Sequence, residues 1–250
     1  MKNIQALLFS GGQGKRLFPI GDYYQKVMMP LGLSGRPVLE YIILHLRSFG
    51  ITQFIALTNY RTNQIRRYFG DGSDYDVEIE YVLDNPKHHG TAGALYNAKE
   101  SIYADDILIY FTDIISNFDV KAMHTFHRKH ENLASLWIDP SWKVQEGMIQ
   151  LKSGNTVMRI NNNPKNILAN TGISILKSQI YEEISFVDSN NSPIISDIST
   201  DLIPELVKVK QVKAYISHEW WIDVGNLSRH RNIKDEILNT KFSHLPKLLN

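Results

Sequence analysis

Three glycines stand within four positions directly after the first apolar run of the chain. Residues 4–9 have the sequence IQALLF, and residues 10–19 continue with SGGQGKRLFP. A short apolar run that ends in glycines is typical of a buried strand. Glycine lets the backbone turn tightly and approach a ligand closely, and the N–H groups of such a turn can hold phosphate oxygens. Because Lys15 and Arg16 add positive charge, the pattern predicts a phosphate-binding loop at the end of a strand.

Strands and helices alternate regularly through the first half of the sequence. The apolar pattern predicts strands at 4–9, 53–57, 77–83 and 106–111, and helices at 38–49, 62–69 and 91–101. Such alternation indicates an α/β fold with a Rossmann-like, mixed and mostly parallel central sheet flanked by helices. In open sheets of this kind ligands bind beyond the carboxyl ends of the strands, where the glycine loop would lie.

The second half of the sequence is less regular. We expect helices at 120–130 and 201–207, and strands at 133–138, 147–151, 156–160, 172–176, 212–216 and 220–223. We find no internal repeat, low-complexity tract or linker-like run. We therefore expect residues 1–250 to form a single domain, in which the second half completes or covers the sheet.

Charge and cysteine content exclude several classes of function. With 27 Lys and Arg against 26 Asp and Glu, the formal net charge is +1, so no global basic field is available for a nucleic-acid backbone. The absence of cysteine excludes disulfides, thiolate metal sites and cysteine nucleophiles. The N-terminus lacks the features of a signal peptide, and no run approaches the roughly 20 apolar residues that span a bilayer. We expect a cytoplasmic protein without nucleic-acid or membrane partners, and the sequence leaves a homo-oligomer open.

The glycine loop matches neither of two common phosphate-binding motifs. A Walker A loop requires Ser or Thr after its lysine, but Lys15 is followed by Arg16. A dinucleotide fingerprint requires a third glycine at the position where this chain has Leu17. The sequence therefore predicts neither a P-loop nor a dinucleotide site.

A series of segments, spread in order along nearly the whole chain, carries a more specific signal. The segments are GGQGKRLFP at 11–19, Lys26 with MMP at 28–30, GRPVLEY at 35–41, GTAGAL at 90–95, Asp113, NTGI at 170–173 and WIDVG at 221–225. Together they resemble the signature of the sugar-1-phosphate nucleotidyltransferases, the nucleotide-diphosphate-sugar pyrophosphorylases.

The resemblance implies a fold of the nucleotide-diphospho-sugar transferase type, with a nucleotide-binding half at about 1–115 and a sugar-binding half at about 116–250. It implies that an NTP and a sugar 1-phosphate give an NDP-sugar and pyrophosphate, by in-line attack on the α-phosphorus with Mg²⁺. Because the attacking phosphate oxygen is already anionic, no general base is needed. Catalysis then depends on positioning and on the stabilisation of charge.

The resemblance also assigns residues to the triphosphate and the metal. Arg16 would neutralise the developing pyrophosphate, and Lys26 would contact the α-phosphate or the sugar phosphate. Asp113 and Asp223 would hold Mg²⁺, which prefers one or two carboxylates together with substrate phosphate oxygens. The backbone that would hold the triphosphate is that of Gly11, Gly12, Gln13 and Gly14.

The base and the sugar would be contacted from the two halves of the chain. Gly90 and Thr91, at the start of a helix, would contact the base or the ribose. Asn85 stands where the family often places a side chain that reads the base, with Asp84 beside it. The sugar would be contacted by Asn170, Thr171, Gly172 and Asn163.

The chain departs from the family pattern at two places. Asn162 and Asn163 replace a Glu-Lys pair that touches the sugar and its phosphate, and Gln25 and Val27 replace the prolines that flank Lys26. These departures leave two functions open. One is an enzyme with an unusual substrate, and the other is a non-catalytic, nucleotide-sugar-binding regulatory subunit of the same fold.

Two groups of histidines allow other functions. His124, His127 and His130 recur at a spacing of three and could bind a metal, but we expect an amphipathic surface helix. His88 and His89 precede the second glycine motif, and we expect them to form a solvated loop pair.

Overall fold

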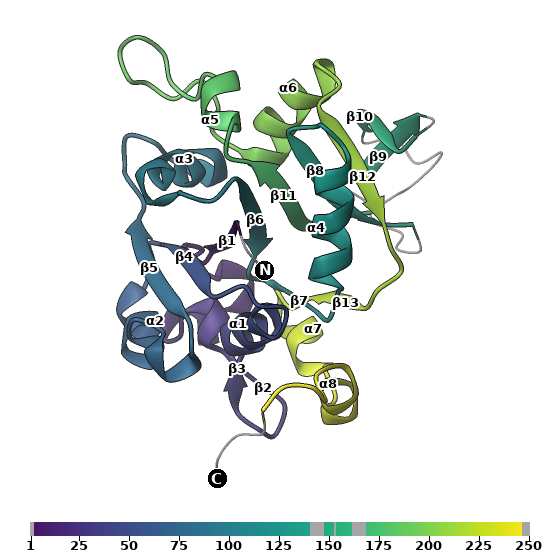
Figure 1. The fold of residues 1–250 in the computed structure, drawn as a ribbon. Helices are drawn as coiled ribbons and strands as arrows, with labels where there is room; N and C mark the ends of the chain where they lie inside the picture. Colours follow the sequence, from purple (N-terminus) through teal and green to yellow (C-terminus); the bar gives the residue numbers. More distant parts are fainter. Residues whose placement is uncertain (1–2, 141–147, 153, 162–168, 247–250) are drawn as a thin grey trace.

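A mixed β-sheet runs through the centre of the computed structural model, which describes residues 3–140, 148–152, 154–161 and 169–246 (Figure 1). Within these residues the sheet has nine strands in the order β5-β4-β1-β6-β11-β8-β12-β10-β9. Their bounds are β1 Ile4–Phe9, β4 Gln53–Thr58, β5 Glu78–Leu83, β6 Asp106–Phe111, β8 Ala134–Asp139, β9 Met148–Lys152, β10 Thr156–Asn161, β11 Ala169–Lys177 and β12 Val212–Ile216.

The direction of the strands confirms the expected sheet. Strands β5, β4, β1 and β6 pair in parallel, and β12 pairs in parallel with β8. Strand β11 runs antiparallel to β6 and β8, and β10 runs antiparallel to β12 and β9. The sheet is therefore mixed and mostly parallel, as the alternation of strands and helices predicts.

Helices cover both faces of this sheet (Figure 1). Their bounds are α1 Val38–Ser48, α2 Thr62–Phe69, α3 Gly90–Asn97, α4 Val120–Lys129, α5 Ile180–Glu183, α6 Ile203–Lys208, α7 Leu227–Arg231 and α8 Asp235–Lys241. Of the helices in the described residues, none has the length and apolar character needed to cross a membrane.

Two apolar cores form, one on each face of the sheet. Side chains of β1 alternate between the faces, so Ala6 and Leu8 pack in the core that α1 and α4 cover. Leu7 points the other way and packs in the core that α3 and α6 cover. Because both faces are covered, a central parallel strand needs apolar residues at nearly every position, which explains the run IQALLF.

The hydrophobic pattern does not predict several short elements. The helix expected at 91–101 ends at Asn97, and α7 and α8 follow the last predicted strand. Strands of two or three residues are too short to show a period. These strands are β2 Pro30–Leu31, β3 Arg36–Pro37 and β7 Ile114–Ser116, the last of which pairs with β13 Trp221–Asp223.

The histidines of α4 hold a buried carboxylate at the start of β6. His124 Nε2 lies 2.7 Å from Asp106 Oδ2, and His127 Nε2 lies 3.5 Å from Asp106 Oδ1. Helix α4 is amphipathic as expected, but the expectation of a surface position is wrong for His127, which is fully buried and also contacts Ser135. The described residues contain no group of three or more His, Cys, Asp or Glu side chains that could hold a metal.

The surroundings of Asp106 determine its ionisation. Burial alone would raise the pKa of Asp106, but the hydrogen bond with His124 and the nearby His127 outweigh burial and hold this pKa well below its usual range. Arg128 adds a cationic partner, with Nη1 at 3.2 Å from Asp106 Oδ2. The folded state therefore favours the carboxylate form of Asp106.

We expect Asp106→Asn to lower the free energy of unfolding by about 3–5 kcal/mol at neutral pH, because it removes one partner from a buried ionic group. A lowered native pKa stabilises the fold above the pKa of an unfolded aspartate, about 4, and this stability is lost as the pH falls below it. The difference between wild type and variant should therefore narrow below about pH 4. Urea unfolding of wild type and variant across this pH range measures the difference in their free energies of unfolding.

The neighbouring Asp105→Asn is the matched control. Asp105 pairs with Arg128 at 3.6 Å, but its side chain is 61% exposed, so we expect a change within about 1 kcal/mol. Equal unfolding midpoints for Asp106→Asn and wild type at neutral pH would contradict a stabilising role for the buried carboxylate.

Candidate active site

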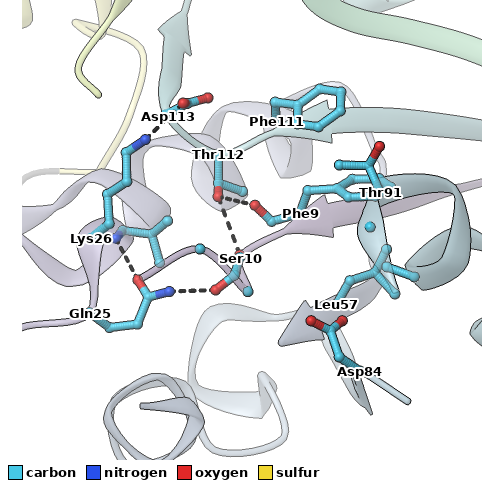
Figure 2. A pocket seen from close by; sticks show the side chains of 15 residues that line it. Phe9, Ser10, Gln25, Lys26, Leu57, Asp84, Thr91, Phe111, Thr112 and Asp113 are labelled. Carbon is cyan, nitrogen blue, oxygen red and sulfur yellow. Dashed lines mark hydrogen bonds and ion pairs between the residues drawn. The ribbon is translucent and has the colours of Figure 1, made fainter. Parts of the chain in front are cut away.

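A cavity of about 330 Å³ opens beyond the carboxyl ends of β1, β4 and β6 (Figure 2). It lies between the glycine loop, the segment 25–27, the start of α3 and the residues that follow β5 and β6. This is the position at which parallel sheets of this kind bind ligands.

The glycine loop contributes backbone to the wall of this cavity. Gly11 and Gly12 line the cavity, whereas Gln13 is exposed to solvent. Gly14 adopts a left-handed conformation with φ of +66°, which suits glycine, and precedes a 3₁₀ turn over Lys15–Leu17. The first two glycines therefore form part of the cavity wall, and Gly14 turns the chain so that Arg16 follows.

Two cations from different segments meet one carboxylate. Lys26 Nζ lies 2.7 Å from Asp113 Oδ2, and Arg16 Nη2 lies 3.7 Å from the same oxygen. The side chain of Lys26 is only 14% exposed, whereas that of Arg16 is 65% exposed. The protein thus holds Lys26 in place, while Arg16 extends into solvent at the edge of the cavity.

Hydrogen bonds from Gln25 fix the segment that carries Lys26. The fully buried side chain of Gln25 donates to the Ser10 carbonyl and accepts from Val27 N at 2.6 Å (Figure 2). The backbone N–H of Gln25 donates to Gln64 Oε1 at 2.6 Å, and Gln64 Nε2 donates to the Tyr23 carbonyl at 2.8 Å. These bonds restrain the backbone at the positions where family members carry prolines.

The two aspartates expected to hold a metal lie on paired strands. Asp113 immediately precedes β7, and Asp223 in β13 is the register partner of Ile114. Val224 N donates to the Asp113 carbonyl at 2.7 Å, which ties the two segments together. The pairing of β7 with β13 therefore brings together residues that are more than a hundred positions apart.

The cations and carboxylates converge around Gly225. A Cβ atom on Gly225 would lie 3.0 Å from Arg16 Nη2, 3.1 Å from Lys26 Nζ and 2.7 Å from Asp223 Oδ1. Asp223 also accepts a hydrogen bond from Gly225 N at 2.6 Å and pairs with Arg229. Because Gly225 has no Cβ, the charged groups of Arg16, Lys26 and Asp223 can approach its backbone closely.

The donor set of this cluster fits a hard divalent cation. Asp113 and Asp223 offer carboxylate oxygens, which Mg²⁺ prefers, and Mg²⁺ usually binds one or two carboxylates and completes its shell with water and substrate phosphates. Two carboxylates therefore suffice, even though no larger group of candidate ligands occurs in the described part of the chain.

The start of α3 closes another side of the cavity. Gly90 has φ of +77°, and a Cβ there would lie 2.1 Å from the Ser196 carbonyl oxygen, so only glycine fits. Thr91 lines the cavity, but its hydroxyl donates to Asp197 at 2.8 Å and accepts from Ile198 N at 2.8 Å. Both residues lie where a nucleotide was expected, with the Thr91 hydroxyl already engaged.

Asp84, rather than Asn85, lines the cavity. Asn85 is exposed, and its side chain accepts a hydrogen bond from Lys87 N at 3.0 Å, which closes a local turn. Asp84 follows β5, lines the cavity, and has a pKa that burial raises above its usual range. The segment predicted to read the base therefore reaches the cavity through Asp84, whereas the side chain of Asn85 is engaged in the local turn.

The histidines before α3 are not a solvated pair. His88 is buried and contacts Asn97 Oδ1 at 3.0 Å and the Asn191 carbonyl at 3.3 Å, whereas His89 is exposed. A Cβ on Gly93 would clash with the His88 carbonyl at 2.4 Å. His88 therefore supports the start of α3 from within the protein.

The residues expected to contact the sugar lie on β11, the strand next to β6. Asn170 Oδ1 accepts a hydrogen bond from Gly172 N at 3.1 Å, and a Cβ on Gly172 would lie 3.6 Å from Phe111. Thr171 is buried and its hydroxyl donates to the Trp137 carbonyl at 3.1 Å, so this hydroxyl faces the protein interior. Asn163 lies outside the described residues.

A family model and several known proteins match this chain. The family model described as nucleotidyl transferase matches residues 5–240. A glucose-1-phosphate adenylyltransferase from Thermosipho africanus is 24% identical over 249 residues, covering 91% of this chain and 60% of that protein. A mannose-1-phosphate guanylyltransferase from Mycobacterium tuberculosis is 30% identical over 127 residues, covering 51% of this chain and 34% of that protein.

A solved structure shares the fold. The crystal structure of a protein assigned as a glucose-1-phosphate thymidylyltransferase from Bacillus anthracis, in complex with sucrose, matches with a TM-score of 0.79 at 19% identity. The match covers 99% of this chain and 96% of that chain. The chain spans about 60% of the length of the adenylyltransferases it matches.

The bonds of Gln25 predict a stability effect. Gln25→Ala leaves the Ser10 carbonyl and the Val27 N–H without these partners, so we expect the free energy of unfolding to fall by roughly 2 kcal/mol or more. Gln25→Glu keeps the acceptor for Val27 N but places a carboxylate oxygen against the Ser10 carbonyl in a buried position, and should lower the free energy of unfolding at least as much. Urea unfolding measures both variants.

Gln53→Ala is the matched control, because the Gln53 amide contacts only an exposed Glu78 side chain among the hydrogen bonds described, at 3.0 Å. We expect a change within about 0.5 kcal/mol there. If Gln25→Ala were as stable as Gln53→Ala, the segment around Lys26 would not depend on Gln25.

Proposed function

The chain belongs to the nucleotidyl transferase family, and from that membership we propose that its cavity joins an NTP to a sugar 1-phosphate, giving an NDP-sugar and pyrophosphate. The observation that carries the proposal is the convergence of Arg16, Lys26, Asp113 and Asp223 around Gly225, beside the glycine loop. The relatives named for adenylyl transfer to glucose 1-phosphate and guanylyl transfer to mannose 1-phosphate support this reaction class.

The reaction needs positioned charge more than proton transfer. An oxygen of the sugar phosphate attacks the α-phosphorus, the bond from that phosphorus to the bridging oxygen breaks, and pyrophosphate leaves with the electron pair. The attacking oxygen is anionic and the leaving group is stabilised as an anion, so no side chain must take up a proton. What the protein supplies is alignment and cations at fixed positions.

Each cation has a place in this scheme. The backbone N–H groups of the glycine loop hold the triphosphate, and the exposed Arg16 folds over the departing pyrophosphate. Lys26, which is held by Asp113 and by the braced segment around it, contacts the α-phosphate or the incoming sugar phosphate. Arg forms bidentate contacts with phosphate, whereas Lys acts as a point charge, which suits the two roles.

The metal and the sugar complete the proposal. Asp113 and Asp223 would hold Mg²⁺, which supplies a Lewis acid for the phosphate oxygens when it is bound. The sugar would lie beside β11, where Asn170 and the backbone of Gly172 adjoin the end of β6. Because the Thr171 hydroxyl is buried, the sugar contacts rest on these two neighbours.

Pyrophosphate release tests the function directly. We expect wild type to release pyrophosphate with at least one pair from a panel of four NTPs and common sugar 1-phosphates. Asp223→Asn should reduce this turnover by roughly 100-fold or more, since it removes a charge that acts at the reacting phosphates. The fold should be retained, because Asp223 lies at the edge of the cavity rather than in either core.

Asp74→Asn serves as the control of equal charge change, because Asp74 is exposed and far along the chain from the cluster. It should leave turnover unchanged. Binding of an NDP-sugar without any pyrophosphate release across the panel would instead favour a non-catalytic regulatory subunit.

Removal of divalent metal provides a separate test. Dialysis against EDTA should abolish turnover, and Mg²⁺ should restore it, because the two carboxylates alone offer no positive charge to the phosphates. Full turnover in EDTA would contradict the proposed role of Asp113 and Asp223.

A further inference from the structure

A carboxylate without a cationic partner lies at the end of the cavity away from the charged cluster. Figure 2 shows Lys26 and Asp113 together on one side and Asp84 beside Leu57 on the other. Asp84 is fixed through its backbone, whose N–H donates to the Thr58 carbonyl at 3.0 Å. Within the described residues, no Lys, Arg or His forms an ion pair with Asp84.

The surroundings of Asp84 in the cavity are largely apolar. Leu57 and Ala94 contribute apolar side chains to the wall, and Gly11 and Gly90 contribute backbone without side chains. A Cβ on Gly11 would lie 3.2 Å from Asp84 Oδ2, so the carboxylate sits directly against the glycine loop. Apolar side chains and bare glycine backbone can pack against the faces of an aromatic ring, and Asp84 adds one strong acceptor to this wall.

The partial burial of Asp84 determines which kind of ligand group it can bind well. Burial raises the pKa of Asp84, and an interaction with the Asn59 side chain only partly opposes this effect. A carboxylate with raised pKa that no cation offsets gains most from a ligand that donates hydrogen bonds to it. The ligand edge that faces Asp84 should therefore carry donors and no acceptors.

The nucleobases differ in this property. An ionised carboxylate has two acceptor oxygens and no donor. The pairing edge of guanine presents two adjacent donors, N1–H and the N2 amino group. Adenine and cytosine present one amino group beside a ring-nitrogen acceptor, and uracil and thymine present one N–H between two carbonyl oxygens. Only guanine can donate to both oxygens without placing an acceptor against the carboxylate.

Resting on the proposed function, in so far as this cavity binds a nucleotide, we propose that Asp84 makes the chain selective for guanine nucleotides by accepting hydrogen bonds from N1–H and the N2 amino group. The far position of Asp84 from Lys26 agrees with a nucleotide whose phosphates lie at the cationic end and whose base lies at the other. The ribose lies between them, which places its hydroxyls nearer the middle of the cavity.

Equilibrium binding of nucleoside diphosphates to the full chain in Mg²⁺ buffer, measured by calorimetry, tests this proposal. We expect wild type to bind GDP at least about 10-fold more tightly than ADP, UDP or CDP. IDP, which lacks only the N2 amino group, should bind several-fold more weakly than GDP. Asp84→Asn should weaken GDP roughly 10- to 100-fold and change ADP little, because its amide places a donor against the donors of guanine.

Asp74→Asn is again the matched control, an exposed carboxylate whose loss should leave all four affinities unchanged. Equal weakening of all four nucleotides in Asp84→Asn would overturn the proposal and indicate a ribose contact. A wild-type preference for ADP, UDP or CDP, or equal binding of GDP and IDP, would also overturn it. The comparison of GDP with IDP uses wild type alone, so it decides the proposal even if the variant does not fold.

The outcomes for the two proposals are separable. Selective GDP binding without pyrophosphate release from any NTP would retain the role of Asp84 and overturn the proposed enzyme. Pyrophosphate release that is equally efficient with every NTP would retain the enzyme and overturn the selectivity. Failure of GDP to bind, together with absence of pyrophosphate release from every NTP, would overturn both.

Discussion

The parallel pairing of β1 with β6 is the constraint on which the rest of the site depends. The two strands align over six residue pairs that end with Phe9 opposite Phe111, and the rings of these residues stack at 4.9 Å. Beyond that point Thr112 is buried and donates from its hydroxyl to the Phe9 carbonyl at 2.7 Å. Because the strands end together, the glycine loop after β1 and Asp113 after β6 emerge side by side.

The length of each sequence pattern determines how much of the fold and the site it predicts. The strand of residues 4–9 and its glycine loop are correctly predicted, because a fully buried strand imposes an apolar run and a tight turn imposes glycine. The proximity of Asp113 and Asp223 is not encoded locally, since it comes from the three-residue pairing of β7 with β13. The family resemblance supplied that pair, whereas periodicity alone gave no sign of it.

Two side chains lie in surroundings that the sequence pattern does not predict. Asp84 and Asn85 are adjacent polar residues after a strand, and which of them faces the cavity depends on a turn that Asn85 closes with Lys87. His127 belongs to an amphipathic helix, but the buried Asp106 on β6 draws it into the interior. A local turn decides which of the first two side chains faces the cavity. The burial of His127 instead depends on Asp106 and Ser135, which lie on two strands of the sheet and which a helical pattern does not encode.

The charges of the molecule explain how a nearly neutral chain can suit polyanions. The formal net charge of the whole chain is +1, yet Arg16, Lys26 and Arg229 gather around Asp113 and Asp223, and Lys26 and Asp113 of this cluster line the cavity. Each carboxylate holds a cation in place before any phosphate arrives, so less reorganisation is required when one does. A localised cluster of this kind attracts phosphate over the few ångströms where screening is weak, and it offers no extended basic surface to a nucleic acid. Asp84 lies at the other end of the cavity (Figure 2) and has no ion-pair partner among the described residues, so the two ends differ in polarity. Under the proposed function, this difference would orient a nucleotide with its phosphates at the cationic end and its base at Asp84.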